Sequence, residues 1–315
     1  MENDSLSLEQ HCQTILQSRR IRGKIVILCE GHIQEFEGRR SPQSYRQMEK
    51  VPDANFYTAC VPKDWTQNRP VFFTCGGRGN VLQTYFKLFD LHSSNPNDSY
   101  LDPEKLFAIV DCDFSPQPIQ DYPFSDLDEI FHALYDRLEL RPSIIPSHRI
   151  FVTGLVHKEN YFLVPELQAV FDKLLCPPQY RTSAKPLDLP GLYKQMAQDL
   201  HQDADLVTHW LRAHQRVKTC TSCDPSNPEK FSQDWQMAFS KAIDPNERST
   251  LAQILLTLRK AKEYWEDYVS PPIDWSQSEQ TYKDQLILAI GRFYSENSHN
   301  PRFHIPFLLK QLQQH

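Results

Sequence analysis

Residues 106–113 read Leu-Phe-Ala-Ile-Val-Asp-Cys-Asp, an apolar run of strand length that ends in two carboxylates. A continuous apolar run is typical of a strand that is covered on both faces of a sheet. Because side chains alternate along an extended chain, Asp111 and Asp113 are expected on the same side, where their oxygens suit Mg²⁺ or Mn²⁺. A lone Asp-x-Asp more commonly just ends a strand and begins a loop. The neighbouring elements must therefore decide between a metal site and an ordinary strand end.

The first half of the chain repeats this pattern of an apolar strand followed by a helix. Three further apolar runs occur, at 25–29, 71–75 and 149–152. Apolar residues at helical spacing follow in three places, at 81–89, 125–138 and 165–175. Strands alternating with helices predict right-handed crossovers and an α/β fold with a mostly parallel sheet flanked by helices. An amphipathic helix over 5–20 leads into the first strand.

Polar and glycine residues follow these predicted strands closely. Glu30 ends the first run, the turn Gly76-Gly77-Arg78-Gly79-Asn80 follows the second, and Glu159 comes shortly after the fourth. In parallel sheets, functional groups gather at the carboxyl ends of the strands. Acidic groups follow three of these strands. This favours the interpretation that they share a divalent cation over the interpretation that each merely ends its strand.

The same residues resemble a known family. Glu30-Gly31 after one strand, Asp111-Cys112-Asp113 after a later one, and the αβ units between them resemble the Toprim (topoisomerase-primase) fold, over roughly residues 20–175. The glycine turn at 76–81 and the segment His157-Lys158-Glu159-Asn160-Tyr161-Phe162-Leu163 are similar to the Toprim modules of OLD (overcoming lysogenization defect) nucleases.

That resemblance implies phosphodiester hydrolysis of DNA or RNA that depends on Mg²⁺ or Mn²⁺, in defence or repair. It implies Glu30 as a metal ligand or general acid or base, Asp111 and Asp113 as ligands, and Glu159 as a further ligand. Metal held by carboxylates supplies the fixed positive charge that a phosphodiester transition state needs.

One position departs from the family pattern. The family often has an Asp four residues after the first Glu, and this chain has Gln34 there, with Glu35 and Glu37 close by. The missing carboxylate favours an alternative function, in which a catalytically weak or inactive Toprim-like module binds nucleotide or nucleic acid without cutting it.

Two basic residues near the acidic set have alternative interpretations. Arg78 and the backbone N–H groups of Gly76, Gly77 and Gly79 form a candidate phosphate site, as glycine turns before helices often do. The alternative is a solvent-facing Arg78 in a loop where glycine serves only the backbone. Lys158 is a candidate for neutralising charge in the transition state, and its alternative is an ordinary surface lysine.

The second half of the chain has a different residue pattern. Prolines at 177, 178, 186 and 190 mark a linker, so we divide the chain into an α/β domain at 1–176 and a mainly helical domain at 177–315. Helices are predicted at 190–217, 228–243, 247–268 and 280–294. The apolar tail at 303–309 is expected to dock on its own core, with partner binding or self-association as a homo-oligomer as the alternative.

Composition limits the class of protein. The 315 residues carry a net charge of −6, which argues against non-specific coating of nucleic acid and leaves only local contact with a polyanion. The chain contains no Walker motif, so an ATPase would have to be a protein partner. Neither an apolar leader nor a membrane-spanning run is evident, and eight scattered cysteines suggest reduced thiols, so a cytoplasmic location is expected.

Overall fold

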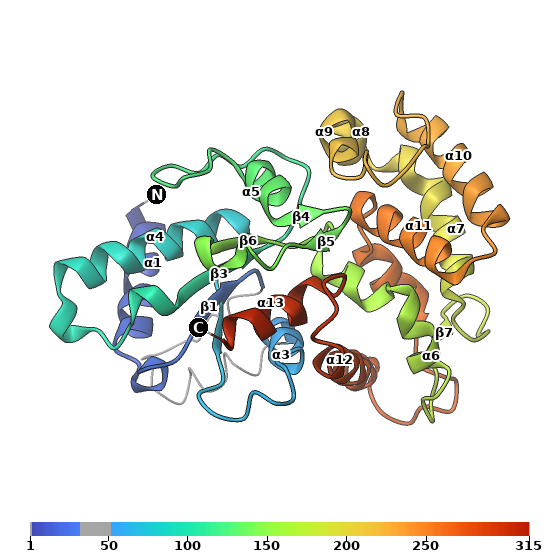
Figure 1. The fold of residues 1–315 in the computed structure, drawn as a ribbon. Helices are drawn as coiled ribbons and strands as arrows, with labels where there is room; N and C mark the ends of the chain where they lie inside the picture. The colour runs from blue at the N-terminus through green and yellow to red at the C-terminus, as the bar shows by residue number, and fades with distance from the viewer. Residues whose placement is uncertain (1, 32–51, 315) are drawn as a thin grey trace.

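The computed structural model describes residues 2–31 and 52–314 (Figure 1). Its centre is a four-stranded sheet in which every pairing is parallel, in the order β2-β1-β3-β6. The strands are β1 (Val26–Cys29), β2 (Val71–Thr74), β3 (Leu106–Val110) and β6 (Ile150–Val152). All four predicted strands are therefore confirmed, as is the parallel α/β sheet.

The strands are buried along their whole length, which explains why their sequences are apolar without alternation. Helices pack against them: α4 (Arg78–Ser94) on β1 and β3, α3 (Pro52–Ala59) on β2, and α5 (Leu127–Leu134) on β6. The helix α1 (Glu2–Leu16) lies against α4 (Figure 1). The helices predicted at 81–89 and 125–138 are thus confirmed in α4 and α5, whereas α3 was not predicted.

The strand order creates a switch point between β1 and β3. The chain runs outward from β1 to β2, then crosses back to place β3 on the other side of β1. Ligand sites in open α/β sheets lie at such points, beyond the carboxyl ends of the strands. Glu30 and Asp111 are the residues that follow β1 and β3.

The remainder of the chain is mainly helical, as predicted (Figure 1). Its helices are α6 (Gln168–Phe171), α7 (Leu189–Gln198), α8 (Ala204–Thr208), α9 (Trp210–Gln215), α10 (Pro228–Lys241), α11 (Pro245–Leu258), α12 (Glu279–Glu296) and α13 (His304–Leu312). Two small antiparallel pairs complete the fold, β4 (Tyr135–Asp136) with β5 (Glu139–Leu140) and β7 (Gln179–Tyr180) with β8 (Val269–Ser270). Among the described helices, none has the length and apolar content to cross a bilayer.

Three predicted helices were wrong in extent. The helix predicted at 165–175 is a 3-10 turn, Pro165–Leu167, followed by the short α6, Gln168–Phe171. The span 190–217 contains three helices, because the Asp203 side chain accepts the N–H of Leu206 and starts α8 afresh. The span 247–268 is interrupted after Leu258, and a short π-helix, Tyr264–Tyr268, follows the break. Neither break disturbs the apolar spacing, so periodicity alone gave one long helix in each place.

The helical region packs closely on the α/β region. Helix α12 lies against α3, and the predicted docking of the C-terminal tail is confirmed by the burial of Ile305, Phe307, Leu308 and Leu309 in α13. A division of the chain at residue 177 stays a prediction.

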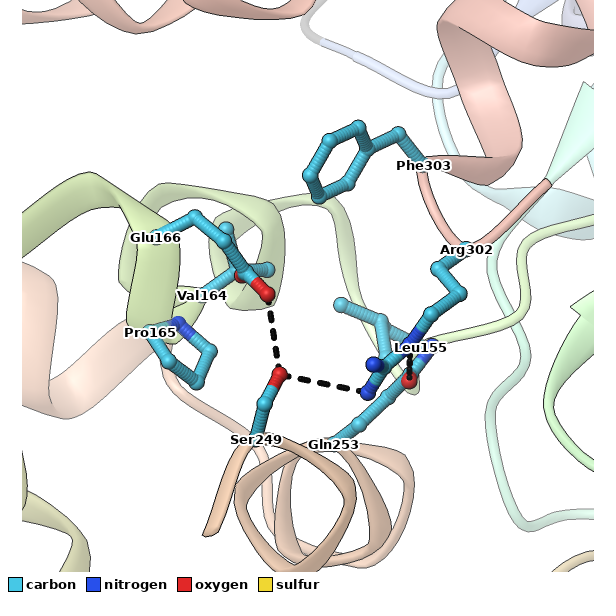
Figure 2. Close-up of a pocket in the computed structure, with 8 residues that line it drawn as sticks. All are labelled: Leu155, Val164, Pro165, Glu166, Ser249, Gln253, Arg302 and Phe303. Carbon is cyan, nitrogen blue, oxygen red and sulfur yellow. Dashed lines mark hydrogen bonds between the residues drawn. The ribbon is translucent and has the colours of Figure 1, made fainter. Parts of the chain in front are cut away.

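A polar network also joins the two regions around a small pocket (Figure 2). Ser249 Oγ donates to Glu166 Oε1 at 2.8 Å, and Arg302 donates to Ser249 Oγ at 3.2 Å and to Gln253 Oε1 at 3.0 Å. Figure 2 shows these side chains pointing toward one another. Because they satisfy each other's hydrogen bonds, we assign this pocket a structural role.

Candidate functional site

The parallel pairing of β1 with β3 brings two of the predicted site residues together. Cys29 and Ile109 are partners in the register, so Glu30 and Asp111 emerge at the same edge of the sheet. Glu30 Oε1 accepts the backbone N–H of Asp111 at 2.8 Å. The two carboxyl groups therefore lie close together, as their places at neighbouring strand ends predict.

Burial disfavours charge on this acidic pair. Burial and the nearby Glu30 carboxylate raise the pKa of Asp111 to about 8, and burial also raises the pKa of Glu30 above its ordinary value. Asp111 Oδ1 is buried and has no hydrogen-bond partner among the described residues. A buried acceptor without a donor is costly, and a cation beside it would remove that cost.

Asp113 has the opposite environment. Its Oδ1 lies 2.9 Å from Lys260 Nζ and 3.8 Å from His157 Nε2. His157 and Lys260 together outweigh burial and hold the pKa of the Asp113 carboxyl well below its ordinary value. Burial disfavours charge on His157, but Asp113 and Asp111 outweigh that effect and raise the pKa of His157.

Lys260 belongs to the helical region and was missed by the sequence analysis. It lies two residues after the end of α11 and also contacts Asp205 Oδ2 of α8 at 2.6 Å. The buried Asn160 side chain fixes this segment by donating to the carbonyls of Leu256 and Arg259 at 2.8 and 2.7 Å. No local motif marks Lys260, because its partners come from distant parts of the chain.

The glycine turn closes one side of the site. Gly31 and Gly76 exchange two backbone hydrogen bonds, of 3.0 and 2.9 Å, and both have positive φ, +152° and +85°. Only glycine adopts such values readily, so these residues tie the start of the loop after Glu30 to the turn after β2. Helix α4 then begins at Arg78, with Gly77 at its N-cap and Gly79 in its first turn.

Arg78 is half-buried and directed toward the acidic residues. It donates to Ser115 Oγ at 2.8 Å and to the Ser115 carbonyl at 3.2 Å, in the loop after Asp113. Its charge opposes the burial effect on the pKa of Glu30. The interpretation of Arg78 as a solvent-facing loop residue is therefore wrong.

Lys158 and Glu159 lie on a short 3-10 helix, Lys158–Leu163, behind the acidic residues. Lys158 Nζ is 3.8 Å from Glu159 Oε1, and the two side chains are only 12% and 13% exposed. The charge of Glu159 contributes to the raised pKa of Asp111, whereas that of Lys158 lowers it. The surface-lysine interpretation of Lys158 is thus wrong.

The predicted acidic set is only partly assembled. Within residues 2–31 and 52–314, no three His, Cys, Asp or Glu side chains are arranged to hold a metal ion together. Glu30 and Asp111 form a pair, Asp113 is directed to Lys260, and Glu159 to Lys158. Of the four predicted carboxylates, only Glu30 and Asp111 thus lie together, and Asp113 and Glu159 are each paired with a lysine.

Some residues singled out in the sequence lie outside the described part of the chain. These are Gln34, Glu35 and Glu37. Cys220 and Cys223, whose spacing is that of a zinc-ligand pair, are free thiols, as are the other six cysteines.

Comparison of the chain with protein-family models, curated proteins and solved structures found no match.

Proposed function

We propose that the chain is a Toprim-like domain followed by a helical domain, and that it hydrolyses phosphodiester bonds of DNA or RNA with Mg²⁺ or Mn²⁺. The partly buried Glu30–Asp111 pair at the β1/β3 switch point carries this proposal, because the buried Asp111 Oδ1 lacks a partner among the described residues. The likeness of the strand-end residues to the Toprim modules of OLD nucleases adds to it.

In this proposal, Glu30 and Asp111 would hold the metal ion, and its charge would neutralise phosphate and lower the pKa of bound water. Arg78, the backbone of Gly76, Gly77 and Gly79, and the N-terminus of α4 face the phosphate. Lys260 adds a positive charge beside Asp113, two residues along the chain from Asp111. His157, whose Nε2 lies 3.8 Å from Asp113 Oδ1, adds a further positive charge to the site when it is protonated.

A second function is favoured by the pairing of Asp113 with Lys260 and by Gln34 in place of an acid. In that case the same site binds a nucleotide or nucleic acid without cutting it. A protein partner such as an ATPase would then supply the activity.

The test compares cleavage of single-stranded and duplex DNA and RNA with Mg²⁺, with Mn²⁺ and with EDTA. We expect metal-dependent cleavage by the wild type, and a loss of about a hundredfold or more in Glu30→Gln and Asp111→Asn. Glu139→Gln, at an exposed carboxylate of β5, is the matched control and should retain activity. If the wild type binds nucleic acid but cleaves none of these substrates, the nuclease function is refuted and the binding function is supported.

A further inference from the structure

The acidic turn, residues 111–113, lies beyond the end of β3 and receives no strand pairing of its own. Its backbone groups therefore need other partners. The N–H of Asp111 donates to Glu30, and the N–H of Cys112 donates to Thr153 Oγ1 at 3.0 Å. The carbonyl groups of Cys112 and Asp113 are bound from the other region of the chain.

A single side chain of the helical region binds both carbonyl groups. Arg216, just after α9, donates from Nη1 to the Cys112 carbonyl at 2.6 Å and from Nη2 to the Asp113 carbonyl at 2.8 Å. A planar guanidinium has donors at fixed angles, so it sets the relative direction of two successive peptide groups. The carboxylates of Asp111 and Asp113 extend from this same stretch of backbone.

Arg216 is itself held firmly. Its side chain is only 2% exposed, and Asp128 Oδ1 of α5 accepts from its Nε at 3.1 Å and its Nη2 at 2.7 Å. Its guanidinium carbon lies over the rings of Phe114 and Phe131, 5.6 and 5.5 Å from their centres. A buried arginine with this many partners has little freedom to let the turn move.

We propose that Arg216 is a positioning residue, which holds the acidic turn so that Asp111 is presented to the Glu30 carboxylate. Its consequence for metal binding rests on the proposed function, whereas the positioning itself does not. The helical region thereby takes part in the site through backbone contacts as well as through Lys260.

Arg212 provides a matched control. It contacts Asp126 and the other oxygen of Asp128, but the structure gives it no contact with the carbonyl groups of the acidic turn. Arg212→Gln therefore removes a neighbouring arginine from the same carboxylate and leaves the turn's own hydrogen bonds in place.

The experiment measures amide hydrogen exchange of the full chain in EDTA for the wild type, Arg216→Lys, Arg216→Gln and Arg212→Gln. We expect exchange in peptides covering 106–116 to accelerate about tenfold in both Arg216 variants and to stay near the wild-type rate in Arg212→Gln. Lysine keeps the positive charge but lacks the two fixed N–H donors of a guanidinium group. Arg216→Lys therefore tests whether these donors hold the turn, even if Arg216→Gln fails to fold. Mn²⁺ affinity, measured by titration calorimetry, should fall about tenfold in both Arg216 variants and stay unchanged in Arg212→Gln.

Wild-type exchange in the turn of Arg216→Lys, or equal acceleration in Arg212→Gln, would overturn the positioning role. Acceleration spread over the whole chain would do so as well, because it indicates lost stability. Faster exchange in the turn of Arg216→Lys, together with no Mn²⁺ binding by the wild type, supports the positioning role and refutes the metal site.

Discussion

Asp111 and Asp113 lie two residues apart, but their electrostatic environments are opposite. Asp111 lies beside another carboxylate with one oxygen unpartnered among the described residues, whereas Asp113 lies between Lys260 and His157. Alternation along a strand predicted a common side for the two carboxylates. It gave no information on Lys260, whose approach depends on the packing of the helical region.

The raised pKa of Asp111 makes stability depend on pH. Its pKa is about 8 in the folded chain, against about 3.9 when unfolded, so its favourable contribution is complete below about pH 4 and is lost as pH rises through 8. Asp111→Asn should therefore be more stable than the wild type in EDTA. Thermal unfolding should show this advantage growing by roughly 2 kcal/mol from pH 6 to pH 9. An advantage that is constant with pH would contradict a protonated Asp111.

Asp113→Asn should have the opposite effect. Because the pKa of Asp113 is lowered, its stabilising contribution is present above pH 4 and is lost as the pH falls through the folded pKa. We expect this variant to lose about 1 kcal/mol at pH 7, as its carboxylate is partly exposed and screened. Urea unfolding at pH 7 checks this, and greater stability in the variant would refute the pairing with Lys260 and His157.

At the scale of elements, the sequence predicted strands better than helix ends. The four strands are buried apolar runs that stop at polar or glycine residues, and each lies where it was expected. Helix ends depend on single caps and on contacts with other segments. The stop after Leu258 is one example, since the Asn160 side chain binds the carbonyl groups there.

The crossing of α3 and α12 depends on a glycine. A Cβ added at Gly291 would lie 2.2 Å from Ala59 Cβ and 3.1 Å from the Ala59 carbonyl carbon. Gly291→Ala should destabilise the chain by about 1–3 kcal/mol, because the helices must move apart. Gly79→Ala, in the first turn of α4 with open space around it, should be neutral or slightly stabilising. Equal thermal unfolding temperatures for the two variants would show that the helices do not cross this closely.

At the scale of the whole molecule, the candidate site draws on both halves of the chain. Glu30, Asp111 and Arg78 come from segments that the sequence analysis identified, because strand ends and glycine turns leave local patterns. Lys260 and Arg216 join them through long-range contacts. Such contacts follow from tertiary packing, and no local sequence pattern encodes them.

The buried Asn160 links the two halves of the chain. Its side chain binds two carbonyl groups and accepts the N–H of Ala261 at 3.1 Å, beside Lys260. Asn160→Leu would leave these groups unpaired and should cost about 2–4 kcal/mol in urea unfolding. Asn95→Leu, at an exposed position, should change stability by no more than about 0.5 kcal/mol. A small loss in Asn160→Leu would mean that water replaces the amide.

The binding of the acidic turn by Arg216 has a consequence for biosynthesis. Chains emerge from the ribosome with the N-terminus first, so the parallel sheet is made well before Arg216 and Lys260. During that interval the nascent chain carries its carboxylates without either cation. The candidate site thus gains its contacts from the helical region only after residue 260 has been translated.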